Sequence, residues 1–253
     1  MKIAPALPRG VETIAEAEDD AGLHVHPVWA VDLPWVVQGI SSRPHDMSLF
    51  GGAPAGSVVP RWQQLRDRLL CSAIVHSRQV HAADVLLHEA VPPGVLIAQD
   101  ADGHATRQTG LLLSVSVADC VPVHVVAPEA RAVALLHAGW RGAAAGILER
   151  GVDALTRHLG AHVSELHIHF GPAICGDCYE VGAEVPRGLG VTDVGVTHVD
   201  LRAHLVERAH ALGIAARRLT VSAHCTRHGD SPFHSHRGGA AERQIAVLGM
   251  RSV

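Results

Sequence analysis

Three short segments place reactive side chains where a strand-like pattern meets a turn marked by Gly or Pro, as in many functional sites. They are QVH (residues 79–81), ADCVP (118–122) and HAGWRG (137–142). Together His81, Cys120 and His137 offer two imidazole nitrogens and one thiolate sulfur. Three protein ligands with a fourth position open are typical of catalytic zinc, which acts as a Lewis acid and activates water. The residue types are therefore those of a catalytic metal site, if the three side chains lie together in the fold.

The spacing of the three residues does not by itself show that they meet. One alternative is that Cys120 is a buried core thiol and that His81 and His137 are ordinary histidines. Another is a metal-free pair of the Cys120 thiolate with either imidazole, which is a nucleophile arrangement found in hydrolases. The residues alone leave all three interpretations open.

The elements that must position these residues can be read from the hydrophobic pattern. It predicts strands over 110–117, 121–126, 132–136, 165–170, 219–223 and 244–248, and helices over 60–71, 143–159 and 200–212. Groups of strands interrupted by a few helices favour an α+β fold with mixed sheets flanked by helices and the metal site at strand ends. Residues 1–27 are predicted to be a weakly structured lead-in to a single catalytic domain over 28–253.

Composition bounds the class of protein. The chain has 253 residues, is 47% hydrophobic and carries a net charge of −4, so the usual electrostatic attraction to nucleic acid is missing. No apolar run approaches the roughly 20 residues that span a bilayer, and the N-terminus lacks the pattern of a signal peptide. Five cysteines, an odd number, point to reduced thiols. These features predict a cytoplasmic protein that binds neither membrane nor nucleic acid.

Two further constellations carry weaker signals. Cys175 and Cys178 could be half of a zinc knuckle, but no second Cys-x-x-Cys exists, so we expect Cys178 to serve packing or to line a site. His167 and His169 fall on one face of a predicted strand, and that alternation is typical of a half-exposed strand with solvent-facing imidazoles.

The motifs occur in the order of one protein family. They are QVH, ADGHAT, ADCVPV, HAGWRG, GPAI-x-x-x-CYEVG, CT, SHR and a late ERQ, between about Gly39 and Val247. On these motifs the chain closely resembles the YfiH/laccase-domain family, whose members are also called polyphenol oxidase, purine nucleoside phosphorylase or peptidoglycan editing factor. HAGWRG with an upstream ADC is highly specific to that family.

The resemblance implies a purine nucleoside phosphorylase in which His81, Cys120 and His137 are catalytic and bind Zn²⁺. Its partners would be phosphate and a purine nucleoside (adenosine, inosine or methylthioadenosine), which is converted to free base and ribose 1-phosphate. Adenosine deaminase activity is a second expectation, and the chain is expected to be a monomer.

The resemblance also implies a set of substrate-side residues. Arg43 corresponds to an Arg of the family's early Ser-Thr-Arg segment and is expected in the catalytic set, because arginine suits a phosphate oxyanion; its alternative is a surface arginine. The expected substrate-binding residues are Asp119, Arg141, His236 and Arg237. Asp119 is also expected to orient a ligand histidine.

The sequence departs from the family pattern in this region. Pro44-His45-Asp46 replaces paired glycines, and Gly238 replaces a second arginine after Ser-His-Arg. These departures predict that part of the wall around the substrate differs from that of the family.

Two other functions remain as alternatives. A copper-dependent polyphenol oxidase of the laccase type needs four His-x-His pairs and a His-Cys-His segment, whereas this chain has three pairs, beginning at His24, His167 and His234, and no His-Cys-His. A cysteine amidase that removes a wrong amino acid from a peptidoglycan precursor would use Cys120 without a metal.

Overall fold

The computed structural model describes residues 2–3, 6–191, 195 and 197–252, and it contains two seven-stranded mixed sheets. In order, the first sheet consists of β3 (Ala17–Glu18), β4 (Leu23–Val25), β5 (Val36–Ser41), β16 (Gln244–Met250), β10 (Leu111–Val117), β6 (Ala73–Ser77) and β8 (Gly94–Ala98). The second consists of β2 (Glu12–Ile14), β15 (Leu219–Ser222), β13 (His167–Phe170), β11 (Val121–Ala127), β12 (Ala132–Ala138), β9 (Gly103–Thr106) and β7 (Val85–His88). A parallel pair joins β1 (Lys2–Ile3) to β14 (His198–Val199).

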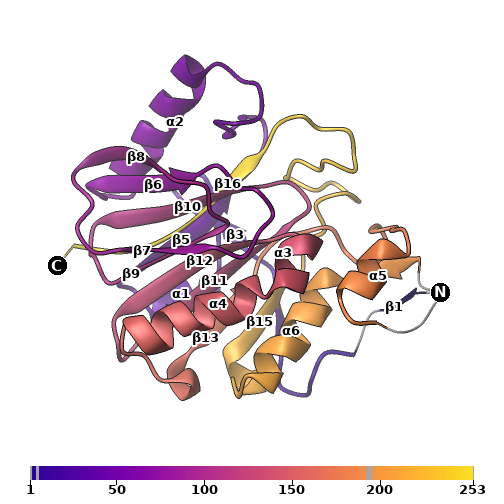
Figure 1. The fold of residues 1–253 in the computed structure, drawn as a ribbon. Coiled ribbons are helices and arrows are strands. Elements are labelled where there is room, and N and C mark those ends of the chain that lie inside the picture. The colour runs from indigo at the N-terminus through magenta and orange to yellow at the C-terminus, as the bar shows by residue number, and fades with distance from the viewer. Residues whose placement is uncertain (1, 4–5, 192–194, 196, 253) are drawn as a thin grey trace.

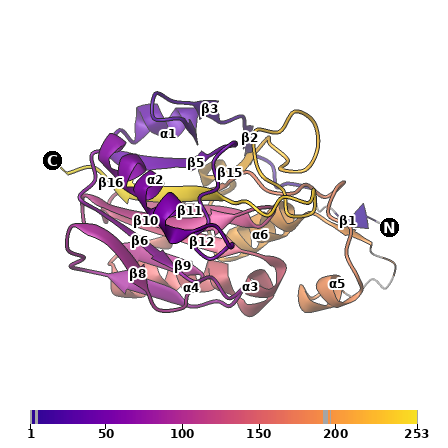
Figure 2. The same cartoon turned by 90° about the horizontal axis from the view of Figure 1, so that it is seen from above.

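The helices lie mainly outside the two sheets (Figures 1 and 2). They are α1 (Pro27–Asp32), α2 (Ala55–Arg68), α3 (Trp140–Ala145), α4 (Ile147–Asp153), α5 (Glu184–Gly188) and α6 (Leu201–Ala211). A π-helical turn η1 (Ala154–His158) extends α4, and two 3-10 turns are η2 (Val163–Glu165) and η3 (Ala216–Arg218). None of the described helices is long and apolar enough to cross a bilayer.

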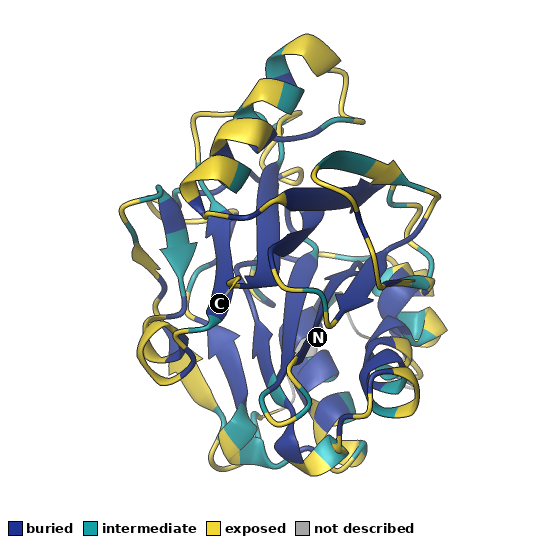
Figure 3. Cartoon of the chain, turned by 90° about the vertical axis from the view of Figure 1, so that its left-hand side faces the viewer, coloured by how far each residue is buried: buried dark blue, intermediate teal, exposed yellow. Residues whose placement is uncertain are grey.

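Three apolar clusters hold these layers together. One lies between the sheets and joins Val115 of β10 to Val133 and Leu135 of β12. The second joins the outer face of the second sheet to α4 and α6, and the third joins the first sheet to Trp62 of α2. The central strands are therefore buried on both faces, as Figure 3 shows, whereas the outward surface of α2 is exposed. This order of layers is the predicted α+β fold of mixed sheets flanked by helices.

The helix predicted over 143–159 is interrupted. Gly146 adopts φ +90° and ends α3, and α4 starts at the next residue. A left-handed residue that ends a helix is usually glycine, because it has no Cβ to clash. The helix predicted over 60–71 instead starts at Ala55, since the Pro54 carbonyl accepts the N–H groups of Ser57 and Val58. The helix predicted over 200–212 is confirmed as α6, which begins after Asp200. The Asp200 carboxylate caps it by accepting the Ala203 N–H at 3.1 Å.

Residues 12–25 differ from the weakly structured lead-in predicted for residues 1–27. Strand β2 pairs in parallel with β15 of the second sheet, and β4 pairs antiparallel with β5 of the first. Between them the buried Glu16 accepts a hydrogen bond from Ser222 Oγ at 2.8 Å. This segment therefore links both sheets to each other.

His169 is not solvent-facing, in contrast to the prediction from strand alternation. It is 3% exposed, and its Nε2 lies 2.8 Å from Oε1 of Glu16. His167 on the same face is half-buried, and its Nε2 lies 3.0 Å from Nη1 of Arg218. His167 and His169 do share one face of β13, as the alternation predicts. That polar face is covered because residues 12–25 pack over it.

Candidate metal centre and active site

The register of two antiparallel strands brings Cys120 and His137 to the same end of the second sheet. Cys120 directly precedes β11, His137 lies near the end of β12, and Pro122 pairs with His137. His81 reaches the same point from the loop between β6 and β7. Three segments that are far apart in the sequence thus converge at strand ends, as predicted.

The ligand atoms of His81, Cys120 and His137 all lie within 4.8 Å of one another. Cys120 Sγ and His81 Nε2 are 4.0 Å apart, and the two imidazole rings have centroids 4.9 Å apart. His137 is buried, Cys120 is half-buried and His81 is exposed. The cluster is therefore closed on its protein side and open on one side, which is the arrangement that a catalytic metal requires.

Gly139 keeps the space between two of these side chains. A Cβ at this position would lie 2.9 Å from Cδ2 of His81 and 3.1 Å from Sγ of Cys120. Any side chain would push into the volume between the ligand atoms, so the turn after β12 requires glycine here.

Asp102 orients the cluster. Its carboxylate accepts a hydrogen bond from Nδ1 of His137 at 2.8 Å, which leaves Nε2 of that ring for a ligand. The same fully buried carboxylate accepts the backbone N–H groups of Val80, His81 and Ala82 at 2.8–3.1 Å. Burial alone would raise the pKa of Asp102, but the bonds and charge of His137 and the N–H groups lower it overall.

The family resemblance predicts Asp119 in that role. The structure gives Asp119 a different one: its carboxylate accepts bonds from Thr226 Oγ1 and from the Arg237 backbone N–H, both at 2.6 Å. Asp102 was missed although it lies in the ADGHAT motif. Its signal was an acidic residue directly before a fully buried strand, since a carboxylate there must be bonded by neighbouring groups.

Two site residues have backbones in the left-handed region that side chains disfavour. His81 has φ +59° and Asp119 has φ +80°. Such conformations cost on the order of 1–2 kcal/mol each and persist where the surroundings fix them. At His81 the three bonds from consecutive N–H groups to Asp102 hold the turn, so the strain aims the imidazole at Cys120.

Cys120 and His137 form a charged pair in the metal-free protein. Burial opposes the thiolate, but the positive charge of His137 and bonds from both histidines lower the pKa of Cys120 to about 6. Burial likewise opposes the imidazolium, whereas the Cys120 thiolate and Asp102 raise the pKa of His137 to about 9. Near neutral pH Cys120 is therefore a thiolate, which is the form that binds metals and attacks electrophiles.

We expect alkylation of Cys120 by iodoacetamide in chelator-treated protein to rise with pH around a midpoint of about 6. The lowered pKa places the thiolate transition well below the roughly 8.5 of a free cysteine. The measurement is peptide mass spectrometry after timed labelling. Buried Cys71, whose pKa burial raises to about 11, is the internal control and should stay unlabelled. A midpoint near 8.5 would contradict this electrostatic interpretation.

Two pockets meet at the cluster. The Arg243 pocket, of about 310 Å³, is lined by the three cluster residues and by Ser48, Phe50, Gly51, His76, Gln79, Ser116, Ala118, His236 and Arg243. The Tyr179 pocket, of about 260 Å³, is lined by His81 and Cys120 together with Ala118, Asp119, Gly139, Trp140, Arg141, Ile174, Tyr179, Leu201, His236 and Arg237. His236 lines both pockets, and Asp119, Arg141 and Arg237 line the Tyr179 pocket. All four residues predicted on the substrate side therefore lie beside the cluster.

The structure does not bring Arg43 to the cluster. Its guanidinium donates to the Ser231 carbonyl, and its side chain lines a separate cavity of about 530 Å³ with Arg61 and Arg68. The backbone explains this position, because the Arg43 N–H is bound to the Pro232 carbonyl just beyond the end of β5. Arg243, which the sequence analysis did not select, supplies a guanidinium beside the cluster instead.

The family profile described as multi-copper polyphenol oxidoreductase laccase matches residues 38–251, and the chain belongs to that family. The chain is 32% identical over 223 residues to a purine nucleoside phosphorylase of Corynebacterium glutamicum, covering 83% of this chain and 89% of the relative. It is 36% identical over 182 residues to a purine nucleoside phosphorylase of Deinococcus radiodurans, covering 68% of each chain.

Another relative is a protein of an unknown prokaryotic organism named adenosine deaminase RL5. It is 35% identical over 179 residues, and the match covers 66% of each chain, slightly less than two thirds of that relative. Among solved structures, YlmD of Geobacillus stearothermophilus is similar with a TM-score of 0.83 and 26% identity, covering 94% of this chain and all of that one. The YfiH protein of Bacillus licheniformis shares the fold with a TM-score of 0.80 at 23% identity.

The family description names copper, but the ligands found here do not suit a four-copper oxidase. The described residues contain two groups of three or more ligand-type side chains whose ligand atoms lie within 4.8 Å of one another. The two groups together include three histidines: His81, His137 and His228. A multicopper centre needs many more imidazoles close together. The described residues therefore fit single metal ions.

Proposed function

We propose that this chain is a zinc-dependent purine nucleoside phosphorylase that releases free base and ribose 1-phosphate from adenosine, inosine or methylthioadenosine. The observation that carries the proposal is the open His81–Cys120–His137 cluster at the junction of two pockets. Its support is the naming of several relatives as purine nucleoside phosphorylases. Adenosine deamination at the same site is a secondary activity, suggested by the relative named adenosine deaminase RL5.

The donor set fits zinc. Two imidazole nitrogens and one thiolate sulfur are ligands that zinc prefers, and the Asp102–His137 bond is the usual support of a ligand imidazole. When bound there, zinc would supply a Lewis acid that polarises an oxygen of phosphate or water. Thiolate and imidazole ligands also suit copper, so the donor atoms alone do not select zinc over copper.

The chain's own residues would bind and orient both substrates. Arg141 and Arg237 line the Tyr179 pocket, and arginine binds phosphate oxygens through paired hydrogen bonds. Their guanidinium groups lie 4.3 and 5.1 Å from the ring centroids of Trp140 and Tyr179, which fixes their direction. The base would then occupy the Arg243 pocket, where the half-exposed Phe50 offers a face for stacking.

In the proposed step a phosphate oxygen forms a bond to the anomeric carbon of the ribose while the bond from that carbon to the purine nitrogen breaks. The electron pair goes to the purine, which takes up a proton. His236 lines both pockets and is the side chain placed to deliver that proton. Arg43 has no part in this step, because it lies in a separate cavity.

The test is incubation of purified protein with inosine, and separately with adenosine and methylthioadenosine, with and without phosphate, and separation of the products by chromatography. From inosine we expect hypoxanthine and ribose 1-phosphate in equal amounts, and only when phosphate is present. Base released equally without phosphate would indicate hydrolysis, and inosine accumulating from adenosine without free base would make deamination the main activity. No reaction with any purine nucleoside would refute the proposal.

A specific observation also favours a second candidate, a cysteine hydrolase. Asp102, His137 and Cys120 form a series of orienting carboxylate, imidazolium and thiolate. Oδ1 of Asp102 lies 2.8 Å from Nδ1 of His137. That arrangement could cleave an amide such as one in a peptidoglycan precursor. Amide cleavage that survives complete chelation would favour this candidate over the zinc phosphorylase.

A further inference from the structure

Four further ligand-type side chains meet outside the site described above. Cys175 and Cys178 lie on the loop that follows β13, and Cys225 and His228 lie on the loop that follows β15. Strands β13 and β15 are parallel neighbours, so both loops leave the sheet at the same edge. A bridge between Ala173 and Cys225 and a bond from the Thr226 N–H to the Ala173 carbonyl hold the loops together.

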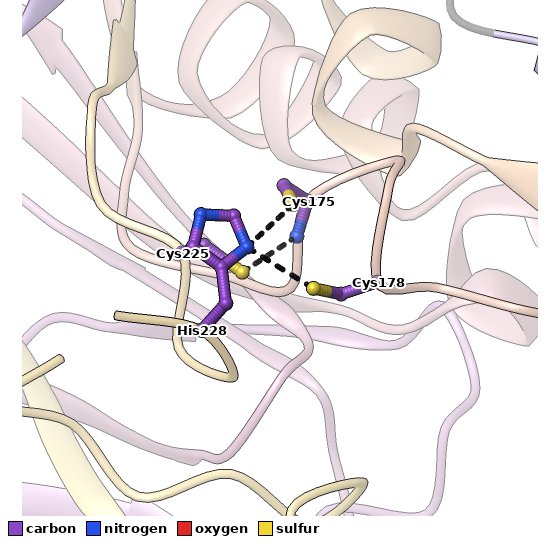
Figure 4. Close-up of side chains that lie close together, drawn as sticks. All are labelled: Cys175, Cys178, Cys225 and His228. Carbon is purple, nitrogen blue, oxygen red and sulfur yellow. Dashed lines mark hydrogen bonds between the residues drawn. The ribbon is translucent and has the colours of Figure 1, made fainter. Parts of the chain in front are cut away.

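Figure 4 shows the four side chains gathered at one point between the two loops. Their ligand atoms all lie within 4.8 Å of one another. Nδ1 of His228 lies 3.1 Å from Sγ of Cys178 and 3.5 Å from Sγ of Cys175. A tetrahedral zinc ion with bonds of about 2.3 Å to sulfur and about 2.0 Å to nitrogen places those atoms about 3.5 Å apart. The side chains are therefore close to the positions that one zinc ion would give them.

The backbone supports a thiolate at Cys225. Sγ of Cys225 accepts the N–H groups of Cys175 at 3.3 Å and of Arg227 at 3.5 Å. The Cys175 carbonyl accepts the N–H groups of Cys178 and Tyr179, both at 3.0 Å, which curls Cys-x-x-Cys into one tight turn. N–H bonds to sulfur stabilise the negative charge that a metal ligand needs.

We propose that Cys175, Cys178, Cys225 and His228 bind a structural zinc ion, distinct from the open site at His81, Cys120 and His137. Four protein ligands of the Cys₃His type close the coordination shell, which is the mark of a structural rather than a catalytic zinc. The expectation that Cys178 serves only packing or site lining is replaced by this role. The second half of the site is Cys-x-x-His at residues 225–228 and not the second Cys-x-x-Cys of a zinc knuckle.

The proposed ion would hold one wall of the Tyr179 pocket. Tyr179 follows Cys178 directly, and Thr226 follows Cys225 and donates to Asp119 at 2.6 Å. Between the two loops, Nη1 of Arg227 donates to the Cys178 carbonyl at 2.8 Å. An ion that fixes both loops therefore also fixes the position of the wall that faces Cys120.

The test starts from a protein in which the other site is removed, the double variant Cys120→Ala/His137→Ala. After purification under reducing conditions we expect about one zinc per chain by elemental analysis. X-ray absorption at the zinc edge should give three sulfur neighbours at about 2.3 Å and one nitrogen at about 2.0 Å. Because neither readout uses activity, the result is independent of the proposed phosphorylase function.

Matched variants in the same background assign the ligands. His228→Ala should lower zinc affinity by about 100-fold or more, whereas His228→Cys, which restores a fourth ligand, should retain about one zinc. Folding of each variant is checked by circular dichroism. A folded Cys120→Ala/His137→Ala protein without zinc would overturn the proposal, as would a Cys175–Cys178 disulfide found in protein isolated under reducing conditions. Zinc affinity of His228→Ala equal to that of its parent, measured by competition with a chelator, would also overturn it.

Discussion

Replacing Cys120 by alanine is expected to lower kcat/KM for inosine phosphorolysis by at least about 10³-fold, which corresponds to about 4 kcal/mol. Cys120 is the single sulfur ligand of the open cluster and is the group whose negative charge balances His137. Without it the two remaining imidazoles hold zinc weakly, and the junction of the two pockets loses its metal. The measurement is the initial rate of hypoxanthine formation together with the zinc content.

Cys71→Ala is the matched control for that variant. Cys71 is another free cysteine, but it is buried and packs in the cluster beneath α2, away from both pockets. The control should keep its rate, with at most a lower melting temperature from the small cavity. A Cys120→Ala protein that retains its activity within about 10-fold would contradict the mechanism. Equal losses in both variants would attribute the effect to folding.

Replacing Asp102 by asparagine is expected to weaken zinc binding at the open cluster by about 10–100-fold, the usual effect of removing a group that supports a ligand imidazole. The carboxylate is fully buried and accepts Nδ1 of His137 as well as three backbone N–H groups. An amide has one acceptor oxygen and no charge, so the imidazole loses its orientation and part of its basicity. Asp102 is a positioning residue, because it touches neither pocket.

Rescue by zinc separates positioning from general destabilisation. Raising free zinc should restore most of the rate of Asp102→Asn, whereas a misfolded site would stay inactive. Asp100→Asn is the control, because Asp100 is exposed and pairs with Arg78 at the surface, where solvent screens the ion pair and its loss affects stability little. Zinc affinity of Asp102→Asn equal to that of the Asp100→Asn control would contradict the role assigned to Asp102.

The sequence predicted the open cluster because its three residues belong to motifs at strand ends, and the strand register then brings them together. Cys120 precedes β11 and His137 lies near the end of the adjacent antiparallel strand β12. The turn motifs that mark these two strand ends were therefore sufficient to predict where the two side chains lie on their strands. The supporting acid was assigned to the wrong residue, since Asp119 is adjacent to Cys120 in sequence while Asp102 reaches His137 only through the pairing of β9 with β12. The residues near Asp102 in the sequence do not indicate that β9 pairs with β12.

Two further differences have the same physical origin. Arg43 matches a family segment, but its backbone is bonded to the Pro232 carbonyl in a way that turns the side chain toward another cavity. The two halves of the Cys₃His cluster are about 50 residues apart, and only the parallel pairing of β13 with β15 brings them together. In each case the contact joins segments far apart in the sequence, and the hydrophobic pattern does not encode which segments meet.

The most direct test of the central claim is removal and return of the metal, with inosine and phosphate as substrates. Protein stripped by a chelator and then titrated with zinc should regain phosphorolysis in proportion to zinc bound at the open cluster, and Cys120→Ala carried through the same titration should not. Base release that returns fully only after zinc is added back would establish that the metal at His81, Cys120 and His137 takes part in phosphorolysis. Full phosphorolysis by the stripped protein, or equal recovery by Cys120→Ala, would contradict the account.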